Sequence, residues 1–94
     1  MGYQAIVTRY LGPTNHRGSR VVARASAGRV FIEYEPGKSP AGNHRDAAFK
    51  LAAKFGWVGT WLEGELPGPH AESVYVLQTA DTFRVEHTDW LLAK

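Results

Sequence analysis

The sequence predicts an α+β domain in which one α-helix packs against an antiparallel β-sheet. Three segments before residue 36 and two after residue 56 have the short, alternating apolar pattern of strands. One stretch between them has the apolar spacing of a helix. The expected order of elements is therefore β-β-β-α-β-β, followed by a C-terminal tail.

The first three strands are expected at residues 3–11, 20–27 and 29–35. The first is rich in β-branched and aromatic residues and ends at Gly12-Pro13. Residues 12–19 carry Gly, Pro, Asn and Ser, which are typical of turns and predict a loop. One face of the second strand carries Val21, Ala23, Ala25 and Ala27, and these alanines leave room for a helix to approach closely.

The helix is expected to follow Asn43, a good N-cap residue, with Asp46 three residues later as a weak form of the capping box. Gly56 is placed to end the helix in the left-handed conformation. The apolar residues between them share one helical face, so Leu51 and Phe55 are predicted to face the sheet. That face consists of Ala47, Ala48, Leu51, Ala52 and Phe55.

Two more strands are expected at residues 57–66 and 73–79, with a short edge strand at 83–85 and a helical turn at 89–94. We expect residues 1–79 to form the single domain and residues 80–94 to form a C-terminal extension. The extension contains the apolar run Trp90-Leu91-Leu92, which needs burial in this chain or against a second one. The oligomeric state is left open, and a homodimer is one alternative.

Several classes of function are disfavoured by composition. The chain has no cysteine, which excludes disulfides, thiolate metal sites and cysteine nucleophiles. No apolar run approaches the roughly 20 residues that span a bilayer, and the N-terminus lacks the pattern of a signal peptide, so we expect a cytoplasmic protein without a membrane partner. The four histidines have no metal-ligand spacing, and no phosphate loop or nucleophile elbow occurs. We therefore expect no metal, no cofactor and no enzymatic activity.

Charge is distributed unevenly along the chain. Residues 1–54 hold nine Lys/Arg against three acids, a net charge of +6, and residues 55–94 hold two against six, a net charge of −4. The first 32 residues contain five arginines and no acid. This pattern indicates either a basic face for a polyanion or a basic half that the acidic half neutralises.

The arginines around the first loop are the candidate binding residues. Guanidinium groups bind phosphates bidentately, and Thr14, Asn15, His16 and Ser19 add neutral donors nearby. Tyr3 and Tyr10 could offer stacking faces to single-stranded bases. In the alternative interpretation, the loop residues only shape the turn and the arginines pair with acids such as Glu63, Glu65 and Glu72. The candidate nucleic-acid-binding residues are Arg9, Arg17, Arg20, Arg24 and Arg29.

The run Thr8-Arg-Tyr-Leu-Gly-Pro-Thr-Asn-His-Arg-Gly-Ser-Arg20 resembles the opening of small uncharacterised proteins common in bacteriophages and conjugative elements. The resemblance continues through Asn43-His44, the alanine-rich helix, Phe55-Gly56-Trp57 and Val74-Tyr75-Val76, and covers roughly residues 3–78. It implies an origin in a mobile element and no particular activity. The tail after Gln78 departs from the shorter pattern of that group.

The predicted order is also similar to that of plant AP2-type and integrase arm-binding domains, which lay three strands into a DNA groove with a helix behind them. In such domains arginines at exposed strand positions contact the DNA, as Arg20, Arg24 and Arg29 could here. The tryptophans typical of AP2 strands are absent from the first three strands, so the likeness is one of architecture.

Two hypotheses for function follow. The first is a small non-enzymatic protein of phage or plasmid origin that contacts nucleic acid through the five arginines. The second is a protein–protein interaction module, such as an inhibitor of a host defence complex. It would use the acidic second half with Trp57, Trp61 and Trp90, since aromatic residues are favoured in interface hot spots.

Overall fold

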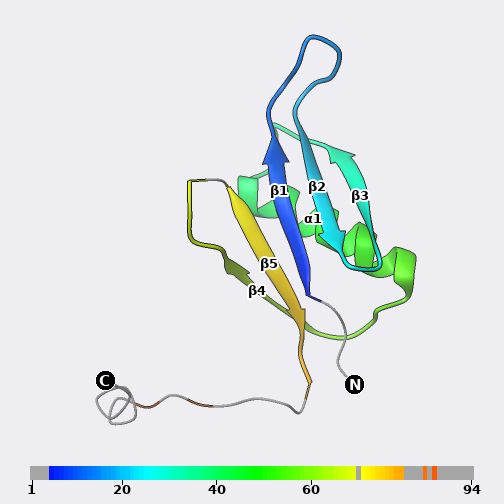
Figure 1. The fold of residues 1–94 in the computed structure, drawn as a ribbon, viewed down its shortest axis with the longest axis vertical. Helices are drawn as coiled ribbons and strands as arrows, with labels where there is room; N and C mark the ends of the chain where they lie inside the picture. The colour runs from blue at the N-terminus through cyan, green and yellow to red at the C-terminus, as the bar shows by residue number, and fades with distance from the viewer. Residues whose placement is uncertain (1–4, 70, 80–83, 85, 87–94) are drawn as a thin grey trace.

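A computed structural model describes residues 5–69, 71–79, 84 and 86, which form one helix and a five-stranded antiparallel sheet (Figure 1). The α+β class and the order β-β-β-α-β-β are confirmed. The elements are β1 (Ile6–Leu11), β2 (Arg20–Ala25), β3 (Gly28–Glu33), α1 (Pro40–Phe55), β4 (Trp61–Glu65) and β5 (Glu72–Leu77).

The strands are arranged in the order β3-β2-β1-β5-β4, so the first strand of the chain lies in the centre of the sheet. The chain leaves the sheet at the β3 edge, crosses one face as α1 and returns at the opposite edge as β4. The helix packs on β1, β2 and β3, behind the strands in the view of Figure 1. One face of the basic strands β1, β2 and β3 is therefore covered by the helix.

The strands are shorter than the sequence predicts, and the largest difference is in β4. It was expected from residue 57 but begins at Trp61, where pairing with Leu77 starts. Gly59 precedes it with φ of 141°, and a Cβ there would lie 2.9 Å from Leu77 Cδ1, so a glycine is needed for this turn into the strand. The elements expected at residues 83–85 and 89–94 fall largely outside the described residues.

The predicted start of the helix was wrong. Ser39, not Asn43, is the N-cap: its hydroxyl accepts a hydrogen bond from the Gly42 N–H at 3.0 Å, and Pro40 occupies the first turn. The predicted end is confirmed, because Gly56 adopts the left-handed conformation with φ of 69°. Asp46 does not complete a capping box but accepts a hydrogen bond from Lys38 Nζ at 2.6 Å.

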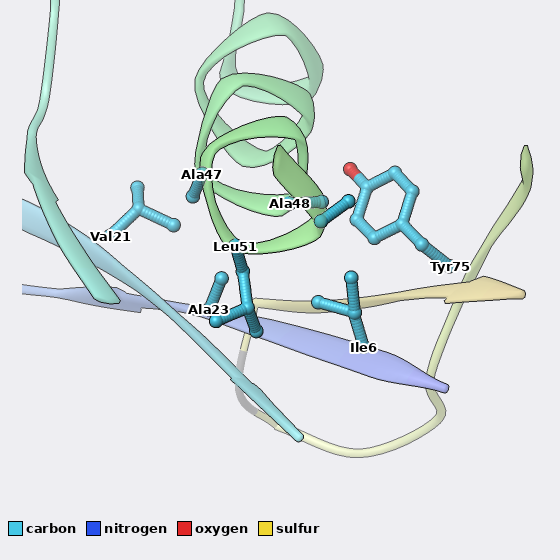
Figure 2. Packing of buried hydrophobic residues seen from close by; sticks show 8 residues of the cluster. Ile6, Val21, Ala23, Ala47, Ala48, Leu51 and Tyr75 are labelled. Carbon is cyan, nitrogen blue, oxygen red and sulfur yellow. The ribbon is translucent and has the colours of Figure 1, made fainter. Parts of the chain in front are cut away.

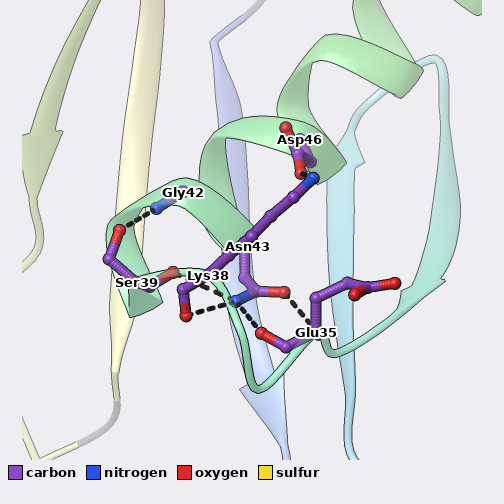
Figure 3. A network of polar contacts seen from close by, with 6 residues as sticks. All are labelled: Glu35, Lys38, Ser39, Gly42, Asn43 and Asp46. Atoms are coloured by element: carbon purple, nitrogen blue, oxygen red, sulfur yellow. Dashed lines mark hydrogen bonds and ion pairs between the residues drawn. The ribbon is translucent and has the colours of Figure 1, made fainter.

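Asn43 is fully buried and joins the helix to the loop that follows β3 (Figure 3). Its Oδ1 accepts from the Glu35 N–H at 2.7 Å, and its Nδ2 donates to the carbonyl oxygens of Glu35 and Ser39, each at 3.0 Å. The side chain thus satisfies the Glu35 N–H and adds a second donor to two carbonyls that already accept from the N–H groups of Lys38 and Asn43.

The core lies between α1 and the sheet, and small residues line the contact (Figure 2). Ala23 faces the helix from β2, as the alanine pattern predicted, so the helix approaches closely. Leu51 is 0% exposed and Phe55 packs against the same cluster, which confirms that both face the sheet. The cluster consists of Ile6, Val21, Ala23, Ala47, Ala48, Leu51, Ala52 and Tyr75. In the described part of the chain, α1 is too short and too polar to cross a membrane.

Candidate nucleic-acid interface

The sheet face opposite α1 has no described element packed on it, and we call it the open face. Directly paired residues of antiparallel strands project to the same side. Because Ile6, Val21 and Tyr75 lie in the core beneath the helix, their strand neighbours project to the open face. The open face therefore carries Val7, Arg9, Leu11, Arg20, Val22, Arg24, Arg29, Phe31, Glu33, Leu62, Gly64, Glu72, Val74 and Val76.

Four of the five candidate arginines share this face. Arg24 of β2 lies directly opposite Arg29 of β3, while Arg20 is paired with Glu33 in the strand register. Arg9 of the central strand β1 has two directly paired neighbours. These are Val22 of β2 on one side and Glu72 of β5 on the other. Like charges directly opposite each other destabilise a sheet, so the Arg24–Arg29 pair adds nothing to the fold by itself.

Phe31 lies among these arginines and is 42% exposed. The guanidinium carbon of Arg20 is 5.1 Å from the centroid of the ring, and that of Arg29 is 5.8 Å from it. Both distances are within the range of cation–π attraction, which holds the two guanidinium groups beside an aromatic surface. Residue Phe31 was not among the sequence candidates, although the period-two pattern already placed it on the same side of β3 as Arg29.

The alternative interpretation, in which acids neutralise the candidate arginines, applies to Arg24. Its Nη2 lies 3.5 Å from Glu72 Oε2 in a partly exposed ion pair. Glu63 instead pairs with Arg45 of the helix at 2.6 Å, on the covered side of the sheet. Within residues 5–69 and 71–79, no acidic side chain forms an ion pair with Arg17, Arg20 or Arg29.

Arg17 lies apart from the other four, in the β1–β2 loop that projects beyond the end of the sheet (Figure 1). Thr14 shapes this loop: its Oγ1 accepts from the N–H groups of His16 at 3.2 Å and Arg17 at 3.0 Å. Its own N–H donates to the Arg17 carbonyl at 2.7 Å. The backbone N–H groups of His16 and Arg17 are therefore used inside the loop.

Tyr10 does not lie on the open face. Its ring packs edge-on against Tyr34 with centroids 5.3 Å apart, and its hydroxyl lies 2.8 Å from Ser19 Oγ. Tyr10 therefore stabilises the base of the β1–β2 loop, on the side of the sheet that the helix covers. Tyr3, the other expected stacking residue, lies outside the described residues.

Among the described side chains, the arrangement that comes closest to a catalytic one is a buried hydroxyl–imidazole pair. Thr8 Oγ1 lies 2.7 Å from His44 Nδ1, a geometry that suits a nucleophile and its base. However, Thr8 is 0% exposed and His44 of α1 is buried between the helix and the sheet, so no substrate can reach them. Burial lowers the pKa of His44, which keeps the imidazole neutral and fits a structural role.

Three other groups on the covered side, Arg45, Glu63 and Tyr75, have shifted pKa values, and that of Arg45 is raised by its hydrogen bond to Glu63. The hydrogen bond from Arg45 lowers the pKa of Glu63, and burial raises the pKa of Tyr75. They belong to a contact between α1 and the β4–β5 edge, and none lies on the open face. Among the described residues, no group of three or more His, Asp or Glu is placed to hold a metal ion.

An apolar groove lies between α1, residues 57–61 and Tyr75. Its volume is about 330 Å³. Trp57 and Trp61 stack with centroids 6.3 Å apart, and both pack against the core rather than project into solvent. The most exposed residues beside them are Phe49, 74% exposed, and Val58, 81% exposed. Trp90, the third tryptophan proposed for an interface, lies outside the described residues.

The function of this chain has to be inferred from its own residues. Four arginines gathered on one sheet face, an aromatic ring between two of them and a fifth arginine in the adjoining loop make the open face the candidate interface. Comparison with models of known families, with curated protein sequences and with solved structures found no match.

Proposed function

We propose that the chain is a non-enzymatic protein that binds nucleic acid through the open face. The observation that carries the proposal is the strand register, which gathers Arg9, Arg20, Arg24 and Arg29 on one side of β1, β2 and β3. Arg17 adds a fifth cation from the adjoining loop. Arginine binds phosphate oxygens through two parallel N–H groups, so such a face suits a sugar–phosphate backbone.

The direct pairing of Arg24 with Arg29 in the strand register supports the proposal of an anionic partner. Their side chains share one side of neighbouring strands, where they repel each other, and the ion pair with Glu72 compensates Arg24 but not Arg29. A phosphate bound between them would replace that repulsion with two charge-assisted hydrogen bonds. Phe31 beside them offers an apolar surface to a sugar or base. An origin in a bacteriophage or conjugative element and action in the cytoplasm are part of this proposal.

The proposal is tested by fluorescence anisotropy with labelled single- and double-stranded DNA and RNA at several salt concentrations. We expect micromolar or tighter binding whose logarithm falls linearly with the logarithm of salt concentration. Arg24→Ala and Arg29→Ala should each weaken binding to all sequences similarly and reduce the salt slope by about one unit.

Lys50→Ala is the matched control, because Lys50 is an exposed cation on the helix, away from the open face. It removes the same charge and should leave the salt slope almost unchanged. Absence of binding to every DNA and RNA at low salt would overturn the proposal. Equal effects of Lys50→Ala and Arg29→Ala would show that net charge, not the open face, determines binding.

The second candidate function is protein recognition through the apolar groove, for example in an inhibitor of a host defence complex. Exposed Phe49 and Val58 beside the stacked Trp57 and Trp61 favour it, since aromatic residues dominate interface energies. A homodimer that uses this groove is the simplest case. Light scattering coupled to size exclusion would detect it, and Phe49→Ser should then convert the dimer to a monomer.

A further inference from the structure

A second hollow lies at the base of the β1–β2 loop, next to the open face. It has a volume of about 430 Å³ and is lined by residues 16–20, Glu33 and Tyr34. The N–H of Tyr34 donates to the Ser19 carbonyl at 3.0 Å, which holds the loop against the end of β3. This volume is within the range of small-ligand sites in proteins.

Donors surround the hollow on the loop side. Arg17, Arg20 and His16 line it and carry side-chain N–H donors, while Ser19 lines it with a hydroxyl that also lies 2.8 Å from Tyr10 Oη. In the described part of the chain, Arg20 Nε is the one buried side-chain nitrogen or oxygen without a hydrogen-bond partner. A buried donor without a partner is unfavourable, and a shift of the Arg20 side chain toward an acceptor oxygen on a bound molecule would satisfy it.

The opposite wall of the hollow differs in chemistry. Tyr34 lines this wall, and its ring makes an edge-on contact with Tyr10. Glu33 contributes a carboxylate, which accepts hydrogen bonds and repels a bare anion. The hollow therefore suits a molecule that has an anionic group at one end and a flat ring with N–H donors at the other.

We infer that this hollow binds one unpaired nucleotide of the nucleic acid held on the open face. Its phosphate lies between Arg17 and Arg20, its base lies against Tyr34, and a base N–H donates to Glu33. The inference rests on the proposed function, because Arg20 belongs to both the hollow and the open face. A base stacked within a duplex cannot enter such a hollow, whereas a terminal or extruded base can.

The test compares two labelled DNA duplexes that differ only in a single unpaired nucleotide at the 3′ or the 5′ end. The full chain should bind the duplex with the unpaired nucleotide about fivefold more tightly or better, the lower end of what stacking one base on an aromatic ring contributes. Arg17→Ala should abolish most of this preference, and Glu33→Gln should change which base is preferred. Lys50→Ala is the matched control and should retain the preference.

Binding to the blunt duplex reports on the open face, and the difference between the two duplexes reports on the hollow. Equal affinity for both duplexes, with salt-sensitive binding retained, would overturn this inference and leave the proposed function standing. A preference that persists in both Arg17→Ala and Glu33→Gln would place the unpaired nucleotide elsewhere and would also overturn it.

Nucleoside 5′-monophosphates test the hollow without the open face. Their titration into the isotope-labelled full chain should shift the amide signals of residues 16–20, Glu33 and Tyr34. Inorganic phosphate should produce smaller shifts at the same concentration, because it lacks the ring and is repelled by Glu33. Equal shifts with phosphate and nucleotide, or no shift with either, would contradict the inference even if no duplex binds.

Discussion

The covered face and the open face of the sheet are built from alternate residues of the same strands, yet they differ in almost every property. Beneath α1, Ile6 and Thr8 of β1 and Val21 and Ala23 of β2 have neutral, fully buried side chains. On the other side of the same two strands project Arg9, Arg20 and Arg24. The difference indicates that the covered face maintains the fold and the open face is available for a partner.

The two faces make separable predictions. Substitutions on the covered face should change the free energy of unfolding and leave the nucleic-acid affinity of the folded fraction unaltered. Substitutions on the open face should do the reverse. A variant that changes both quantities strongly would show that the two faces are coupled.

The largest effect on stability is expected at Leu51. Its side chain is fully buried between the helix and the sheet, so Leu51→Ala should reduce the free energy of unfolding by about 2–5 kcal/mol. Urea denaturation followed by circular dichroism measures this change. Phe49→Ala, on the exposed side of the same helix, is the control and should change it by less than about 0.5 kcal/mol. A loss below about 1 kcal/mol at Leu51 would mean that the covered face does not carry the stability.

Asn43→Ala should have the next largest effect. It removes the hydrogen bonds to Glu35 and Ser39 and leaves the Glu35 N–H without its partner, at about 1–3 kcal/mol. Ser39→Ala, which removes only the helix cap, should cost about 1 kcal/mol. If the two variants have the same free energy of unfolding in urea, the contacts of Asn43 do not hold the helix to the loop after β3.

Stability should also depend on pH through His44. Burial lowers the pKa of His44 in the folded state below its unfolded value near 6.5, so the unfolded chain binds the proton more readily. The contribution is fully present above about pH 6.5 and is lost as pH falls toward the lowered pKa. Urea midpoints should therefore decrease from pH 7.5 to 5.5, and His44→Gln should flatten that dependence. His16→Gln, in the exposed loop, should retain it.

The smallest effect on stability is expected on the open face. Arg29→Ala removes an exposed side chain that is opposed by Arg24, so the free energy of unfolding should change by no more than about 0.5 kcal/mol. The same variant should weaken nucleic-acid binding, as proposed above. A loss of stability comparable to that of Asn43→Ala would show that Arg29 is needed for the fold, and the distinction between the faces would fail.

The sequence by itself determined the class of the fold and the order of its elements. Period-two alternation in the strands and the apolar stripe from Ala47 to Phe55 are local patterns, and each indicates its element without knowledge of the rest. Gly56 likewise marks the end of the helix because its conformation depends only on its own backbone. The covered side of β2 could be predicted for the same reason.

Only the tertiary structure decided what the polar residues do. Asn43 is a residue type that favours the N-cap. The loop after β3 passes close enough for the Asn43 side chain to bind Glu35 instead, and Ser39 caps the helix. The strand order β3-β2-β1-β5-β4 brings Glu72 to Arg24 and leaves Glu63 to Arg45. It also sets the register in which the arginines share one face with Phe31. Such pairings join residues far apart in the chain, so no local pattern in the sequence specifies them.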